Sequence, residues 1–154
     1  MHIIKKLLKE ANNAYNKADY LAYMTYPLVK EAKLLGVIID NINIALTKGV
    51  EAVVAYDRLY KRVALIKSSF SKELAIFRDH CSRRHNIDPS IISLIKEISA
   101  IAKSRKESPV EFVRNNKYII CSNDYKMKTI TMDKVKNYLE ATKQFMMKIN
   151  QIIR

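Results

Sequence analysis

Glycine, cysteine and long apolar runs are all scarce in this chain of 154 residues. Its two glycines are too few for the Gly-rich phosphate loop of a P-loop or dinucleotide-binding fold. Its two cysteines cannot form a disulfide framework, so we expect a reducing, cytoplasmic location. No secretory signal is visible, and the longest strongly apolar stretch, residues 34–39, is far shorter than the ~20 residues needed to cross a bilayer. We therefore expect no membrane partner.

A metal-ligand spacing is missing as well. Cys81 and His85 are four residues apart and could share a helical face, but no pattern supplies two further ligands. A buried structural cysteine is the commoner arrangement. We predict no metal site and no cofactor.

Positive charge is abundant and unevenly distributed. The net charge is +13. Residues 1–57 carry 7 Lys/Arg against 6 Asp/Glu, whereas residues 58–154 carry 21 against 9. The excess of +12 in the later part favours a polyanion partner, most often nucleic acid. The alternative is a lysine-rich surface that only keeps the protein soluble.

Most of the chain has the apolar periodicity of helices. A first helix is predicted to end near Tyr26-Pro27, and a second to cover residues 33–67 with an apolar surface around most of its circumference. Gly49 lies within the second helix, where close approach of another helix is its best justification. A third helix is predicted over residues 70–85.

Helix-start signals divide the rest of the chain. Asp88-Pro89 pairs an N-cap acceptor with a first-turn proline, and Ser108-Pro109-Val110-Glu111 has the pattern of a capping box that opens a short helix. Short β-compatible runs over residues 117–130 predict a hairpin, and Thr131 is predicted to cap a final helix. The fold class is therefore mainly α: a single domain, residues 1–154, with five or six bundled helices and a small β-hairpin insertion near residues 117–130.

The densest group of reactive side chains lies at the end of the third predicted helix. On a regular helix, Arg78 and His85 project within about 20° of each other and lie ~10.5 Å apart along the axis. They would share a face at the surface. Acting together would need a bound phosphodiester, a broken helix end or a second subunit.

Arg78, the polar Asp79 and His85 resemble the signature of the HEPN (higher eukaryote and prokaryote nucleotide-binding) helical domains. The opening segment, Leu7 to Leu21, followed by a long apolar helix, is similar to the entry of that bundle, so the resemblance covers about the first 90 residues.

The resemblance implies a bundle that often forms a homodimer, in which paired motifs make a cleft for metal-independent RNA cleavage. His85 would then exchange protons with the 2′-hydroxyl or the leaving 5′-oxygen, Arg78 would stabilise the phosphate charge, and Asp79 would orient either one. Many family members are inactive and act as binding modules or toxin-system partners. The alternative is a solvated basic helix end, in which Arg78, Arg83, Arg84 and His85 complement the helix dipole.

A second group of cations and tyrosines surrounds the predicted hairpin. These side chains suit phosphate contact and base stacking, but lysines can equally protect an edge hairpin from aggregation. With the arginines above, the candidate nucleic-acid-binding residues are Arg78, Arg83, Arg84, Arg114, Lys117, Tyr118, Tyr125, Lys126 and Lys128.

Three functions follow from these patterns. The charge distribution favours a basic helical protein that binds RNA or associates with ribonucleoprotein. The family resemblance favours a HEPN-like ribonuclease, and the apolar second helix favours a scaffold or dimerisation module without nucleic acid.

Overall fold

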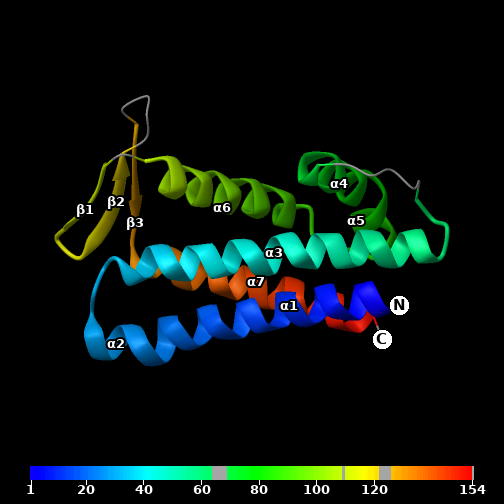
Figure 1. The fold of residues 1–154 in the computed structure, drawn as a ribbon, viewed down its shortest axis with the longest axis horizontal. Helices are drawn as coiled ribbons and strands as arrows, with labels where there is room; N and C mark the ends of the chain where they lie inside the picture. Colours follow the sequence, from blue (N-terminus) through cyan, green and yellow to red (C-terminus); the bar gives the residue numbers. More distant parts are fainter. Residues whose placement is uncertain (64–68, 109, 122–125, 154) are drawn as a thin grey trace.

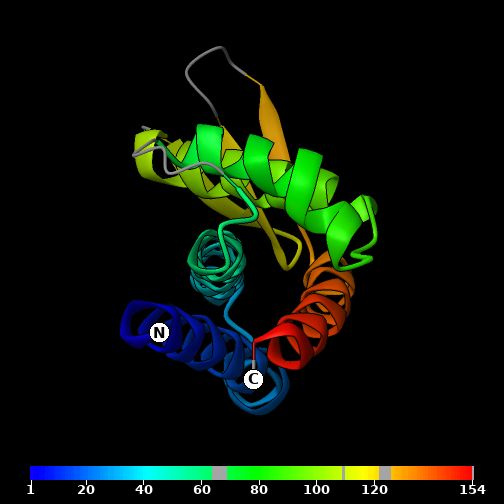
Figure 2. The same ribbon diagram turned by 90° about the vertical axis from the view of Figure 1, so that its right-hand side faces the viewer.

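One long helix, α3 (Leu34–Leu59), runs through the middle of the molecule (Figure 1). The computed structural model describes residues 1–63, 69–108, 110–121 and 126–153. Viewed end-on, helices surround α3 on several sides (Figure 2), and α3 contacts α1, α4, α6 and α7. More than half of its residues are buried, which confirms that its apolar circumference faces other helices.

Within the described part of the chain, the elements form five continuous helical segments and one three-stranded antiparallel sheet, which confirms the mainly α fold with a small β insertion. In chain order the elements are α1 (His2–Tyr20), η1 (Leu21–Thr25), α2 (Tyr26–Val29), α3, α4 (Phe70–Ile76), η2 (Phe77–Cys81), α5 (Ser82–Arg84), α6 (Ser90–Glu107), β1 (Val110–Arg114), β2 (Lys117–Cys121), β3 (Met127–Ile130) and α7 (Met132–Ile152).

The first helical segment continues beyond its predicted end. It ends at Val29, two residues beyond the predicted boundary near Tyr26-Pro27, because the backbone stays helical through η1 and α2. In η1, a π turn, the amide of Tyr26 donates to the carbonyl of Leu21, five residues back. A proline ring in a regular α-helix clashes with the carbonyl four residues earlier, here that of Tyr23. The wider π turn gives Pro27 room.

The second predicted helix ends earlier than expected, at Leu59. Lys61 takes the left-handed conformation with φ 57°, and the amide of Arg62 donates to the carbonyl of Asp57 at 2.8 Å. This bond and the left-handed residue before it are those of a Schellman motif, in which glycine normally takes the left-handed position. The sequence signal was missed because lysine occupies the left-handed position. Residues 64–67 of the predicted helix lie outside the described residues.

Both glycines lie in α3 at points of close approach. A Cβ on Gly49 would lie 2.7 Å from Cδ1 of Ile149 on α7, which confirms the predicted close packing of another helix. A Cβ on Gly36 would lie 2.3 Å from both Nε of Arg105 and Cε2 of Tyr118. Gly36 therefore leaves the space in which the sheet and α6 meet α3.

The short helix predicted after Ser108 is wrong, because β1 occupies that position. Ser108 and Glu111 do not complete a capping box with each other. The Ser108 hydroxyl donates to the carbonyl of Cys121, and the Glu111 carboxylate accepts from the hydroxyl of Tyr118. Both side chains therefore bond to residues of β2, and not to each other as the capping box predicted.

The predicted hairpin is confirmed by antiparallel pairing of β2 with β3, in which Tyr118 lies opposite Ile130. Its connection, residues 122–125, lies outside the described residues. The additional strand β1 joins β2 through Asn115 and Asn116, whose φ values of 52° and 60° are those of a two-residue hairpin turn.

Two helix starts agree with the sequence. Oγ1 of Thr131 accepts from the amide of Lys134 at 3.3 Å, which confirms the cap of α7. Oδ1 of Asp88 accepts from the amide of Ser90 at 2.9 Å, directly before α6. Among the described residues, no helix is both long enough and apolar enough to span a bilayer.

We expect Val53→Asp to lower the free energy of unfolding by about 4 kcal/mol or more, because it places an unpaired carboxylate at a fully buried position of α3. Ile44→Asp is the matched control, since Ile44 is on the same helix but 44% exposed, and it should cost about 0.5 kcal/mol. Denaturant unfolding followed by circular dichroism measures both. Equal losses in the two variants would contradict the central position of α3.

Candidate nucleic-acid interface

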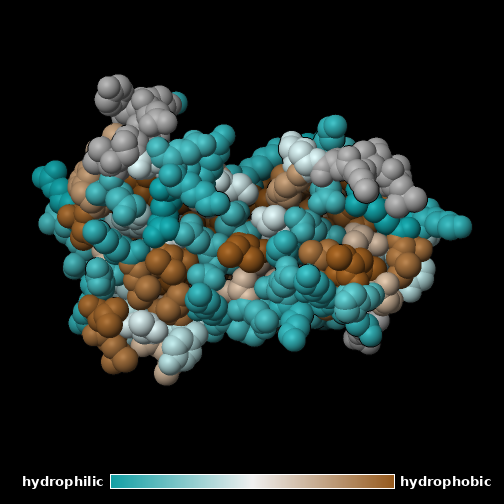
Figure 3. Space-filling view, viewed as in Figure 1, coloured by the Kyte–Doolittle hydropathy of each residue, from teal (hydrophilic) through white to brown (hydrophobic). Residues whose placement is uncertain are grey.

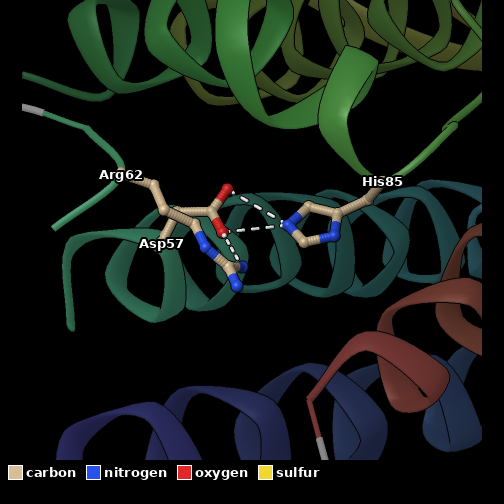
Figure 4. A network of polar contacts seen from close by, with 3 residues as sticks. All are labelled: Asp57, Arg62 and His85. Atoms are coloured by element: carbon tan, nitrogen blue, oxygen red, sulfur yellow. Dashed lines mark hydrogen bonds and ion pairs between the residues drawn. The ribbon is translucent and has the colours of Figure 1, made fainter. Parts of the chain in front are cut away.

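A fully buried carboxylate, Asp57, lies in the last turns of α3 and binds two basic side chains (Figure 4). Nε2 of His85 lies 2.9 Å and 3.1 Å from the two carboxylate oxygens. Nη1 of Arg62 donates to Oδ1 at 3.3 Å. A buried carboxylate is costly unless it is paired, so these contacts hold both basic residues against α3.

The third helical segment, formed by α4, η2 and α5, places the Cys81 thiol against the same carboxylate. Burial raises the pKa of the Cys81 thiol, and its hydrogen bond to Asp57 raises it further. Asp57 was not among the candidates from the sequence. Its signal was present, since Asp57 follows Val53 and Val54 at helical spacing on a buried face, where a charge requires partners.

Arg78 has a different carboxylate partner, on the outside of the molecule. Its Nε donates to Oδ1 of Asp79 at 2.9 Å and its Nη2 to Oδ2 at 3.3 Å. Both side chains are about half exposed. The hydrogen bond to Arg78 is the main cause that lowers the pKa of Asp79.

The structure does not bring Arg78 and His85 together on one exposed face, as the regular helix predicted. Arg78 lies at the surface with Asp79, whereas the His85 side chain is only 12% exposed and turns inward to Asp57. The reason is η2, a π turn in which the amide of Ser82 donates to the carbonyl of Phe77. This turn contains one residue more than a regular α-helical turn. The prediction assumed a rotation of 100° per residue between Arg78 and His85, so it fails across this turn.

A cavity of about 440 Å³ opens beside the end of the same segment, and we call it the α5 cavity. It is lined by Arg78, Ser82, Arg83, Asn86, Ile87, Pro89 and Ile92. Among the described residues, the lining thus holds two arginines and no carboxylate. The backbone explains the position of Asn86, which takes φ 55° at the end of α5, with the amide of Ile87 bonded to the carbonyl of Ser82 at 2.8 Å.

The two arginines that follow η2 are both exposed, but they differ in position. Arg83 lines the α5 cavity, whereas Arg84 is not one of its lining residues. The two side chains carry the same charge and are neighbours in sequence.

The cations predicted around the hairpin lie at the other end of α6 from α5 (Figure 1). Arg114, Lys117 and Lys126 are exposed. Lys128 is half-buried, and its Nζ lies 3.3 Å from Oγ of Ser104. Tyr125 lies outside the described residues.

Tyr118, predicted to stack on bases, is fully buried and cannot do so in this fold. Its hydroxyl accepts from Nε of Arg105 at 3.1 Å and donates to Glu111, while Arg105 also binds Asp40. Burial, assisted by the bond to Glu111, raises the pKa of Tyr118 to about 12. Strand alternation turned this ring toward the core and left Lys117 outside.

Among the described residues, no group of three or more histidine, cysteine or acidic side chains could hold a metal ion. In comparisons with known proteins, no family model matches the chain, and no curated protein and no solved structure shows significant similarity to it.

We expect Cys81 to be protected from thiol reagents in the native protein, because its Sγ is buried and its thiol pKa is raised. A Cys121→Ser variant isolates Cys81. At about pH 8, near the ordinary thiol pKa, this variant should stay unlabelled when native and label fully in denaturant. The Cys81→Ser variant is the control, in which half-buried Cys121 should label faster. Rapid labelling of native Cys121→Ser would contradict the position of Cys81 against Asp57.

Proposed function

We propose that this chain binds RNA through a basic surface centred on the α5 cavity. The observation that carries the proposal is the composition of the cavity wall: Arg78 and Arg83 both line it, and none of its described lining residues is acidic. A guanidinium can donate two parallel hydrogen bonds to phosphate oxygens, so two arginines on one concave surface suit a phosphodiester.

The contact between Arg78 and Asp79 is compatible with this binding. Both groups are about half exposed, and water screens an ion pair of this kind. A phosphate oxygen can therefore replace the Asp79 carboxylate on Arg78. Arg83 is also exposed, so the cavity can offer both guanidinium groups to one backbone.

The charge of the chain favours a long polyanion over a single small anion. Residues 58–154 carry an excess of +12, which includes the exposed Arg84 beside the cavity and the exposed Arg114 and Lys117 on the sheet. Asn86 adds an amide that can both donate and accept, which suits the 2′-hydroxyl by which proteins distinguish RNA from DNA.

Arg83→Ala should weaken binding to a single-stranded RNA oligonucleotide about tenfold at ~50 mM salt, because it removes a charge-assisted contact to phosphate. The slope of log affinity against log salt should fall by about 0.7, the value for one lost phosphate contact. Fluorescence anisotropy over ~50 to ~200 mM salt measures both quantities.

Arg84→Ala is the matched control, since it removes the same charge one residue away from the cavity wall. It should cost less than about threefold, and Lys9→Ala on α1 should have no effect. Wild-type affinity that does not change with salt, or equal losses in all three variants, would overturn the proposal. Sensitivity confined to Arg114, Lys117, Lys126 and Lys128 would instead place the interface on the sheet.

A HEPN-like, metal-independent ribonuclease is the second candidate, and the contact between His85 and Asp57 favours it. The carboxylate fixes the orientation of the ring through Nε2, so Nδ1 would be the nitrogen that transfers a proton. This activity also requires that the RNA reach the His85 side chain, which is 12% exposed. In addition, Arg78 would have to exchange its contact with Asp79 for one with the phosphate.

If the chain is such a nuclease, it should cut RNA in the presence of a chelator, leave cyclic 2′,3′-phosphate ends and spare DNA, which lacks the 2′-hydroxyl. Gel analysis of an end-labelled oligonucleotide tests this. Arg78→Ala and His85→Gln should each abolish cleavage; the glutamine can still bond Asp57, so a retained helical spectrum separates lost chemistry from lost folding. Intact RNA with wild-type protein that binds it would assign Arg78 to phosphate contact alone.

A further inference from the structure

A second cavity, of about 310 Å³, lies beside η1 and α2, far along the molecule from α5 (Figure 1). We call it the α2 cavity. It is lined by Ala22, Tyr23, Tyr26, Pro27, Lys30, Asn116, Met132 and Lys136. Its volume is at the lower end of the ~300–1,000 Å³ typical of small-molecule sites.

Three separate segments build this cavity. The first helical segment supplies both tyrosines and Lys30, the β1–β2 turn supplies Asn116, and the first turns of α7 supply Met132 and Lys136. Hydrophobic side chains gather around α2 on the surface (Figure 3), and the tip of this segment includes the strongly exposed Leu28 and Val29. The cavity therefore opens on a surface whose apolar groups are not all used by the core.

The side chains that line it include two aromatic rings and two cations. Tyr23 is 48% exposed, so packing in the core does not account for its position. Nζ of Lys136 lies 5.9 Å from the centroid of the Tyr23 ring, and Lys30 is exposed at the same mouth. None of the lining residues that the structure describes is acidic.

The backbone around the cavity is unusual at two of its edges. Tyr23 lies inside the π turn η1, a type of turn frequent at functional sites. Lys30, which follows α2, takes φ 48°, in the left-handed region that non-glycine residues rarely adopt, whereas φ 60° at Asn116 belongs to the two-residue turn between β1 and β2. Together these features direct an aromatic ring, an amide and a cation to one opening.

We infer that the α2 cavity binds a single nucleotide unit. The base would stack on Tyr23 and Tyr26, and the phosphate would lie between Lys30 and Lys136. A planar π system with an attached anion is the chemistry that matches tyrosines beside lysines. The inference does not depend on the α5 cavity, because the two cavities share no lining residue.

Isothermal titration calorimetry with AMP tests this site. Wild-type protein should bind AMP at least tenfold more tightly than adenosine, because the lysines recognise the phosphate. Lys136→Ala and Tyr23→Ala should each weaken AMP binding about tenfold, and Tyr23→Phe, which keeps the ring, should restore it. Both residues are exposed, so circular dichroism should be unchanged.

Lys143→Ala is the matched control, since it removes an exposed lysine two turns further along α7 and should leave AMP affinity unchanged. A short oligoadenylate that competes with AMP identifies the nucleotide as part of an RNA strand, whereas AMP binding without competition identifies a free nucleotide. No binding of AMP or oligoadenylate at millimolar concentration overturns the inference, as does binding that Tyr23→Ala and Lys136→Ala do not weaken. Arg83→Ala should leave AMP binding intact, so failure at one cavity is distinguishable from failure at the other.

Discussion

The packing of α3 against α1, α4, α6 and α7 positions every candidate site in this chain. More than half of α3 is buried by this packing, and the two cavities lie where other segments meet around it. The α5 cavity lies where η2, α5 and the start of α6 meet, and the α2 cavity lies where η1, α2 and α7 meet the β1–β2 turn. Gly36 and Gly49 allow this close packing, because a Cβ at either position would press on a neighbouring side chain.

The buried charge of Asp57 imposes a second constraint at one end of α3. A carboxylate removed from water must be paired, and its partners come from two different parts of the chain: Arg62 follows α3, whereas Cys81 and His85 belong to the third helical segment. This pairing fixes that segment against α3 and turns His85 inward. Arg78 and Arg83 are left facing the solvent beside the α5 cavity.

Local patterns in the sequence predicted the elements whose signals are satisfied locally. The cap at Thr131, the hairpin of β2 and β3, and the tight contact at Gly49 all depend on neighbours close in sequence or on the size of one residue. Two of the errors have the opposite cause. Glu111 bonds to Tyr118 on another strand, so no short helix forms. Strand alternation turns Tyr118 inward, and Arg105 of α6 bonds its hydroxyl there.

The candidate site was predicted in part for the same reason. Positive charge identified Arg78 and Arg83 without any knowledge of the fold, since surface cations need no specific partner. The orientation of His85 could not be predicted, because it depends on a carboxylate 28 residues away and on a π turn that no local pattern marks. The sequence marks Asp57 as a charge on a buried helical face, but it does not predict that His85 is a partner of this carboxylate.

The two π turns also bear on how the chain tolerates changes in length. Each contains one residue more than a regular helical turn, so the segment after it is rotated by about 100° relative to an uninterrupted helix. Deleting one residue within η1 would reverse this rotation and turn the α2 side chains away from the cavity that they line together with α7. A homologous chain shorter by one residue at either turn could therefore retain the core of α3 while it loses the α2 or the α5 cavity. In an alignment, a one-residue gap at either π turn would therefore mark a chain that shares the fold but not the adjoining cavity.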